Sequence, residues 1–158
     1  MAIAGLVNKS GIIYDTTVER RWTVVLDTNV LEAAVRSQRG ASYAILSRVG
    51  KGLFDVAVSV PVVLEYEEVL TRSRTGRSRR IAQDVIDYVC AVAKPQPIFF
   101  LWRPRLSDPD DDMVLELAVA AGCDAIITFN RRHFEPTTAG FGIRVLAPAE
   151  FLEEIGEA

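Results

Sequence analysis

The sequence has few of the side chains that bind transition metals or form disulfides. Its two cysteines, Cys90 and Cys123, lack C-x-x-C spacing, and it has a single histidine, His133. Two separate cysteines within apolar stretches indicate buried free thiols in a reducing compartment. We therefore expect neither a zinc site nor a redox pair, and one histidine cannot form a histidine-based metal site.

Long apolar runs are also missing. The sequence contains no stretch of about 18 consecutive apolar residues, so we expect no transmembrane helix. Residues 1–10 lack the basic leader and long apolar core of a signal peptide. These absences predict a cytoplasmic protein with no membrane association.

The chain has no excess of basic residues. Its formal net charge is −3, and hydrophobic residues make up 49% of its 158 residues. This hydrophobic content excludes a disordered polymer, and the length suits one domain with a real core. The net charge does not decide for or against a nucleic-acid partner, because the distribution of charge matters more than its sum. We expect an N-terminal extension over residues 1–21 and one domain over residues 22–158.

From residue 22 onward, short apolar runs alternate with helix-start signals. Strands are predicted at residues 22–26, 55–58, 98–102, 124–129 and 143–146. Helices are predicted at residues 30–36, 42–49, 61–71, 81–93, 108–122 and 148–155. Strands separated by helices predict an α/β fold, with about five mostly parallel strands between two helical layers.

Polar side chains are expected together at the carboxyl edge of this sheet, where open parallel sheets bind ligands. Asp27 follows the first strand and Glu65 lies in the helix after the second strand. Asp111 opens the helix after the third strand, and Asn130 follows the fourth. Neighbouring carboxylates repel one another, and a cation stabilises them. Ligands that are all oxygen select hard cations such as Mg²⁺ or Mn²⁺.

Four segments carry a resemblance to a known family. VVLDTNVL, SVPVVLEYEEVLTR, DPDDDMVLELAVAAGCDAIITFN and RRHF look like the PIN domain family over about residues 22–151. Their order and spacing resemble the ribonuclease toxins of VapC-type toxin–antitoxin modules. The resemblance implies a three-layer α/β/α PIN-like fold and metal-dependent cleavage of RNA that leaves 5′-phosphate and 3′-hydroxyl ends. It also implies a small antitoxin partner, and we expect a homodimer.

The resemblance implies particular roles for the site residues. Asp27, Glu65 and Asp111 match the catalytic, metal-binding acids, whereas the fourth acidic position falls on the amide Asn130. This departure leaves open whether the site binds a second metal ion. Supporting roles at the turns and in the acidic runs are expected for Thr28, Asn29, Asp108, Asp112, Glu68 and Thr128.

Each signal also has a simpler interpretation. Asp27 can be a helix cap, and the acids at 108–112 a favourable helix N-terminus, with Asp108 and Asp112 as caps or secondary ligands. Glu65 can be a solvated helix residue, and Glu67 and Glu68 compete with it for its role in the site. An arginine-rich stretch is either a solvated loop or a grip on RNA phosphates. Its members are Arg72, Arg74, Arg77, Arg79 and Arg80. Arg131, Arg132 and His133 are further candidates for contact with the RNA backbone. His133 fits a packing residue equally well and is given no catalytic role.

Two other functions were weighed against the nuclease. Receiver and phosphatase folds also place an aspartate at a strand end with Mg²⁺. Such phosphatases need a second aspartate where Asn29 stands, and receivers need a lysine where Ala147 and Pro148 stand. A PIN domain that acts as a binding module fits better, and Asn130 is its main support.

Overall fold

The computed structural model describes residues 20–99, 106 and 108–157. Its centre is a sheet whose five strands all run parallel, in the order β3-β2-β1-β4-β5. The predicted α/β class with a parallel sheet is confirmed. The strands are β1 (Trp22–Leu26), β2 (Phe54–Val58), β3 (Lys94–Pro95), β4 (Ala125–Ile127) and β5 (Arg144–Leu146).

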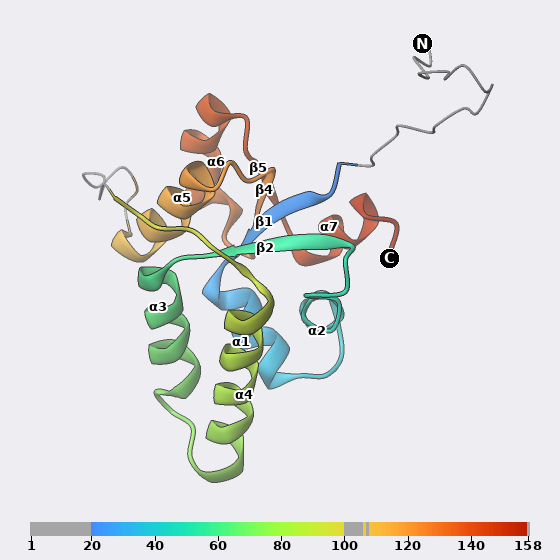
Figure 1. Cartoon of the computed structure of the whole chain (residues 1–158), viewed down its shortest axis with the longest axis vertical. Helices are drawn as coiled ribbons and strands as arrows, with labels where there is room; N and C mark the ends of the chain where they lie inside the picture. The colour runs from blue at the N-terminus through green and yellow to red at the C-terminus, as the bar shows by residue number, and fades with distance from the viewer. Residues whose placement is uncertain (1–19, 100–105, 107, 158) are drawn as a thin grey trace, which may run out of the picture.

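Helices connect the strands and cover both faces of the sheet. They are α1 (Thr28–Arg36), α2 (Ala41–Leu46), α3 (Val60–Thr71), α4 (Gly76–Val92), α5 (Pro109–Ala120), α6 (Arg131–Thr138) and α7 (Pro148–Glu154), with a 3₁₀ turn at Ala139–Phe141. The pair α3 and α4 lies on one side of the sheet, with α5 and α6 on the other (Figure 1). Within the described ranges, no helix is both long and apolar enough to cross a membrane.

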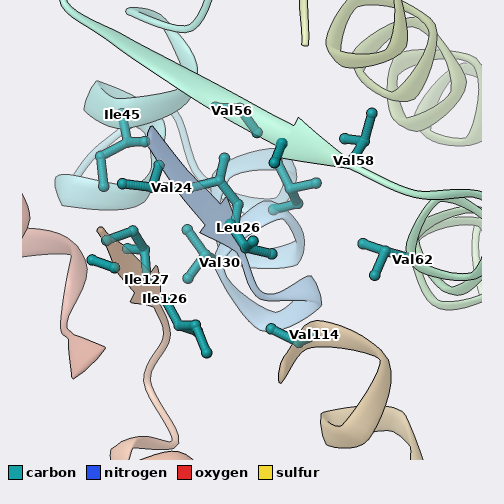
Figure 2. Packing of buried hydrophobic residues seen from close by; sticks show 14 of the residues in the cluster. Val24, Leu26, Val30, Ile45, Val56, Val58, Val62, Val114, Ile126 and Ile127 are labelled. Atoms are coloured by element: carbon teal, nitrogen blue, oxygen red, sulfur yellow. The ribbon is translucent and has the colours of Figure 1, made fainter. Parts of the chain in front are cut away.

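The core is built around β1, the middle strand. Its last three residues, Val24 to Leu26, have no exposed surface, which fits the continuous apolar run expected of a central parallel strand. Figure 2 shows Val30 of α1, Val62 of α3 and Val114 of α5 gathered around Leu26. This packing fixes the position of the residue that follows Leu26, which is Asp27.

The third strand lies earlier than predicted. It is formed by Lys94 and Pro95, whereas residues 98 and 99 are in no strand and residues 100–102 lie outside the described part of the chain. Pro95 has no N–H, so the next residue, Gln96, donates from its backbone N to Val58 O at 2.7 Å. Proline is tolerated here because β3 is an edge strand. The prediction was wrong because Pro95 and Pro97 were interpreted as the end of the preceding helix, and the strand was therefore expected only after them.

A second difference is helix α6, which was not predicted. It contains Pro136 in its interior, and only Phe134 and Thr138 are buried. A proline beyond the first turn normally ends a helix, and two buried residues give a weak periodic signal. Helix α4 also starts earlier than predicted, at Gly76, so most of the arginine-rich stretch after Arg74 is helical rather than loop. Cys90 of this helix is exposed and Cys123 is buried, so the expectation of two buried thiols was wrong for Cys90.

The remaining boundaries agree with the sequence within a few residues. The clearest is the end of α5, where Gly122 has a positive φ of 61°. Cys123 N donates to Ala118 O at 2.8 Å across this turn. A glycine adopts this left-handed conformation without steric cost, as predicted for the helix end.

Candidate active site

The strand order changes direction between β1 and β4. From β1 the chain builds the sheet outward through β2 and β3, and then returns to place β4 on the other side of β1. Asp27 follows β1 directly, and Thr128 follows β4 directly. The carboxyl edge at such a switch point is where open α/β sheets bind ligands.

Hydrogen bonds across this switch point hold the Asp27 carboxylate. Thr128 Oγ1 donates to Asp27 Oδ2 at 2.6 Å, and Asn29 Nδ2 donates to the same oxygen at 2.8 Å. Thr128 is fully buried and Asp27 is 6% exposed. Two of the six predicted supporting residues therefore donate to Asp27, Thr128 from the end of the neighbouring strand β4 and Asn29 from the first turn of α1. A third, Thr28, is the buried first residue of α1.

The loop between β4 and α6 is tied to the same place. Thr128 Oγ1 accepts from the backbone N of Asn130 at 2.9 Å, and Asn29 Oδ1 accepts from the backbone N of Phe129 at 3.3 Å. Asn130 itself is exposed and precedes α6 as its N-cap residue. The predicted fourth site position thus lies beside Asp27 in the fold, although the two are far apart in sequence.

Asp111 is the second buried acid of the site. Burial raises the pKa of Asp27 above its ordinary value, hydrogen bonding from Thr128 lowers it, and the charge of Asp111 raises it further. Burial likewise raises the pKa of Asp111, and the hydrogen bond from His133 opposes that rise. The two carboxylates therefore lie close enough to repel each other in a poorly solvated place.

His133 was expected only as a candidate for contact with the RNA backbone or as a packing residue, and its contact with Asp111 was not predicted. Its Nδ1 donates to Asp111 Oδ2 at 2.6 Å, and its side chain is half exposed. This contact exists because α6 begins at Arg131 and brings its first turn to the start of α5. Without a predicted α6, nothing in the sequence placed His133 near Asp111.

Glu65 is half-buried on α3 and belongs to a neighbouring acidic group. Burial raises its pKa, followed by the charges of Asp110 and Glu68. Asp108 acts in the same direction, while Arg72 lowers the pKa. Glu65 therefore interacts mainly with the first turn of α5 and with its own helix. Across the described residues, no three histidine, cysteine or acidic side chains are gathered closely enough to hold a metal ion.

Comparison with known families decides the family of the chain. A family model described as PIN domain matches residues 23–132. The chain belongs to the PIN domain family. Proteins with PIN domains are typically nucleases and generally use divalent metal ions. The predicted family is therefore confirmed.

Solved PIN-like structures share the fold. VapBC2 from Rickettsia felis, bound to a promoter DNA fragment, has a TM-score of 0.58 at 15% identity and covers 79% of this chain and 98% of its own. FitAB bound to an IR36 DNA fragment has a TM-score of 0.55 at 19% identity, and the match covers 79% of this chain and 94% of the FitAB chain. VapBC-1 from nontypeable Haemophilus influenzae has a TM-score of 0.52 at 14% identity, and the match covers 80% of this chain and 98% of the VapBC-1 chain. No curated protein sequence matches the chain.

Three other predicted supporting residues of the PIN domain make structural contacts. Asp108 is the N-cap of α5, where its Oδ1 accepts from Asp110 N at 3.1 Å. Asp112 is buried, and its Oδ1 accepts from Leu106 N at 3.0 Å. Glu68 forms an ion pair with Arg72 one helical turn away. These contacts hold the segment before α5 and the surface of α3.

The arginines that were predicted to contact RNA lie in two places. Arg74 donates from Nη1 to Leu70 O at the end of α3, and the exposed Arg77, Arg79 and Arg80 lie at the start of α4. Figure 1 shows the turn between α3 and α4 at the far end of α3 from its start beside the sheet. Arg131 lies near the carboxyl edge, where it pairs with Glu135 at 3.0 Å and Glu150 at 2.7 Å.

Asp27 and Asp111 supply the kind of oxygen donor that binds a hard divalent cation, whereas Glu65 lies in the neighbouring acidic group. Asp27 and Asp111 are buried, and both have raised pKa values because ionised carboxylates are poorly solvated there. A cation between them would relieve their repulsion and replace the lost solvation. Oxygen donors without sulfur select Mg²⁺ or Mn²⁺ over zinc.

Proposed function

We propose that this PIN domain, assigned to residues 22–158 after an extension over residues 1–21, is a metal-dependent endoribonuclease that hydrolyses RNA phosphodiester bonds. The observation that carries the proposal is the buried pair of Asp27 and Asp111 at the switch point of the sheet. Two buried carboxylates that repel each other lower the stability of the folded chain, and such a cost is expected where a site is kept for function. Membership of a family that is typically nucleolytic supports the same function.

The proposed ligands are Asp27 and Asp111, with Glu65 bound directly or through water. When bound, Mg²⁺ or Mn²⁺ would make a water molecule more acidic and stabilise the charge that develops on the phosphate. Thr128 holds one oxygen of Asp27 and His133 holds one oxygen of Asp111, so both carboxylates are oriented in advance. We assign Asn130 the role of orienting a water molecule at the site.

We further propose that the chain is the toxin of a toxin–antitoxin module and acts in the cytoplasm. Three structures with the same fold are VapBC and FitAB assemblies, which supports this. The motif order, which resembles VapC-type toxins, supports it independently of the fold. Its partner would be a small antitoxin that covers the acidic carboxyl edge, and the active form would be a homodimer.

The nuclease proposal is tested by cleavage. Wild type, Asp27→Asn and Asp84→Asn are incubated with single-stranded and structured RNA in Mg²⁺, Mn²⁺ or EDTA. Asp84 is an exposed acid of α4 and provides the matched control. We expect wild type and Asp84→Asn to cleave RNA only with metal, and the cleavage rate of Asp27→Asn to fall more than about 100-fold. Cleavage that persists in EDTA or in Asp27→Asn would reject the proposal.

A second candidate function is supported by Asn130, because an amide brings no charge to a position where the family resemblance implies an acid. In that case the chain is a catalytically weak or inactive PIN domain that binds RNA or protein. Asn130→Asp distinguishes the two candidates. A binding module would cleave weakly as wild type and gain cleavage when the acid is restored, whereas a competent nuclease would gain little.

A further inference from the structure

Phe129 is an exposed aromatic residue beside the carboxylate pair. Its side chain is 54% exposed. It stands between Thr128, which donates to Asp27, and Asn130, whose backbone N donates to Thr128. The backbone N of Phe129 donates to Asn29 Oδ1. The bonds that place the Asp27 carboxylate therefore also fix the backbone from which this ring projects.

The exposure of Phe129 contrasts with the burial of the next aromatic along the chain. Phe134 of α6 has no exposed surface and belongs to the core. The segment that follows β4 can thus bury an aromatic ring, and it leaves Phe129 at the surface. An exposed phenylalanine keeps apolar surface in water at a cost, which a ligand with a flat face would recover by stacking on the ring.

A basic residue follows Phe129 closely in the sequence. Arg132, near the start of α6, is exposed, and it forms no ion pair with any acid among the residues that the structure describes. Its neighbour Arg131 is paired with Glu135 and Glu150. Aromatic rings and cations are the groups that proteins use on single strands, where bases stack on rings and phosphates meet positive charge.

We propose that Phe129 is a positioning residue whose ring stacks on the base of an unpaired nucleotide next to the scissile phosphate. This inference rests on the proposed nuclease function and adds the residue that positions the RNA. A duplex cannot offer such a base, because its bases are already stacked on each other. An unpaired nucleotide in a loop or at an end offers both a free face and a reachable phosphate.

The test measures binding separately from cleavage. The full chain with Asp27→Asn, in Mg²⁺, is titrated into a fluorescein-labelled single-stranded RNA and into a blunt RNA duplex, and anisotropy gives the dissociation constants. Phe129→Ala, Phe129→Tyr and Phe129→Trp are added to this background. Leu53→Ala is the matched control, since Leu53 is an exposed apolar residue just before β2, at the opposite edge of the sheet.

We expect Phe129→Ala to weaken single-strand binding about 5-fold to 100-fold, the effect of removing one base–aromatic contact. Phe129→Tyr, Phe129→Trp and Leu53→Ala should bind as the parent does, and duplex affinity should be unchanged by all of them. Phe129→Trp should show an indole fluorescence change on binding that exceeds any change from the two tryptophans of the parent. Equal single-strand affinity in Phe129→Ala and the parent would overturn the proposal, as would no single-strand binding by the parent.

Two further outcomes separate this inference from the proposed function. If wild type cleaves RNA and Phe129→Ala cleaves and binds equally well, the nuclease stands and the stacking role fails. If single-strand binding depends on Phe129 but wild type never cleaves, the stacking role stands and the nuclease fails. A changed oligomeric state of Phe129→Ala in size-exclusion chromatography, with unchanged RNA affinity, would make the ring a protein contact and overturn the proposal.

Discussion

At the scale of single residues, the Asp27 carboxylate is buried near that of Asp111, and both its burial and the charge of Asp111 raise its pKa. The hydrogen bonds from Thr128 and Asn29 lower the pKa, but by less than that rise. In the unfolded chain its pKa has the ordinary value of 3.8, and in the folded chain the pKa is higher. Above pH 3.8 the unfolded chain loses this proton before the folded chain does. Ionisation of Asp27 therefore lowers the free energy of unfolding as pH rises.

The first prediction is that Asp27→Asn stabilises the metal-free protein. The amide keeps an oxygen that accepts from Thr128 and Asn29 but carries no charge against Asp111. We expect the melting temperature in EDTA near neutral pH to rise by about 2–4 °C, the shift for about 1 kcal/mol in a domain of this size. Differential scanning calorimetry measures it.

The pH dependence and a control complete this test. The gain of Asp27→Asn over wild type should shrink as pH is lowered through the raised pKa of Asp27 toward 3.8, because wild type then takes up its proton. Asp84→Asn should leave the melting temperature unchanged at each pH. A melting temperature of Asp27→Asn at or below wild type at neutral pH would contradict the account.

The sequence reveals the acids of the site better than the groups that hold them. Asp27 can be predicted because it ends an apolar run, and its position needs only local information. The hydrogen bond from Thr128 requires β4 to lie beside β1, and the contact of His133 with Asp111 requires α6. Both depend on tertiary neighbours, which a single sequence does not give.

At the scale of secondary-structure elements, α3 is fixed to β1 by a buried tyrosine. Tyr66 has no exposed surface, and its hydroxyl donates to Leu26 O, one residue before Asp27. Burial raises the pKa of this hydroxyl, which therefore stays protonated as a donor. Glu65 precedes Tyr66 on the same helix, so this bond sets the position of Glu65 relative to Asp27.

The second prediction concerns this bond. Tyr66→Phe leaves Leu26 O without its hydroxyl partner and should lower the melting temperature by about 2–4 °C, for a loss of about 1 kcal/mol. Tyr88→Phe is the matched control, because Tyr88 donates to Val49 O at 2.7 Å from a half-exposed place where water can substitute. Equal losses in the two variants would show that the bond to β1 has no special weight.

The third prediction concerns the start of α6. Arg132→Ala should weaken single-stranded RNA binding several-fold and reduce the slope of log affinity against log salt by about 0.7, the value for one lost phosphate contact. Arg131→Ala should change the slope less, because Arg131 is already paired with Glu135 and Glu150. Anisotropy titrations at several salt concentrations measure both slopes. Equal slopes for Arg132→Ala and Arg131→Ala would show that Arg132 contacts the RNA phosphates no more than Arg131 does.

Two elements show where prediction from the sequence fails. Strand β3 is two residues long and contains Pro95, so it carries no apolar pattern and is defined by its pairing with Val58. Helix α6 contains Pro136, which locally indicates a helix end. In contrast, β1 and α5 were predicted well, because a buried apolar strand and a capped helix leave signals in consecutive residues.

At the scale of the whole molecule, folding brings together residues that share no sequence neighbourhood. Asp27 comes from the first strand connection, Asp111 from the start of α5 and Asn130 from the connection after β4. The sheet order that unites them is a global property of the fold. A ligand bound at this edge therefore links several distant segments and should stabilise the entire domain.

The fourth prediction follows from this linkage. A divalent cation that binds the folded chain and not the unfolded one raises the melting temperature with concentration, by an amount equivalent to about 2.7 kcal/mol at 100 times its dissociation constant. We expect Mg²⁺ and Mn²⁺ to stabilise wild type and to have little effect on Asp27→Asn or Asp111→Asn. Differential scanning calorimetry with and without metal measures the shift. Equal stabilisation of all three proteins would place the cation elsewhere.

We propose that Asp27 and Asp111 together hold a divalent cation, and calorimetric titration of Mn²⁺ into the purified chain measures this binding. We expect saturable binding to wild type and to Asp84→Asn, and affinity reduced at least about 10-fold in Asp27→Asn and in Asp111→Asn. Binding to both site variants with the affinity of wild type would contradict the proposal.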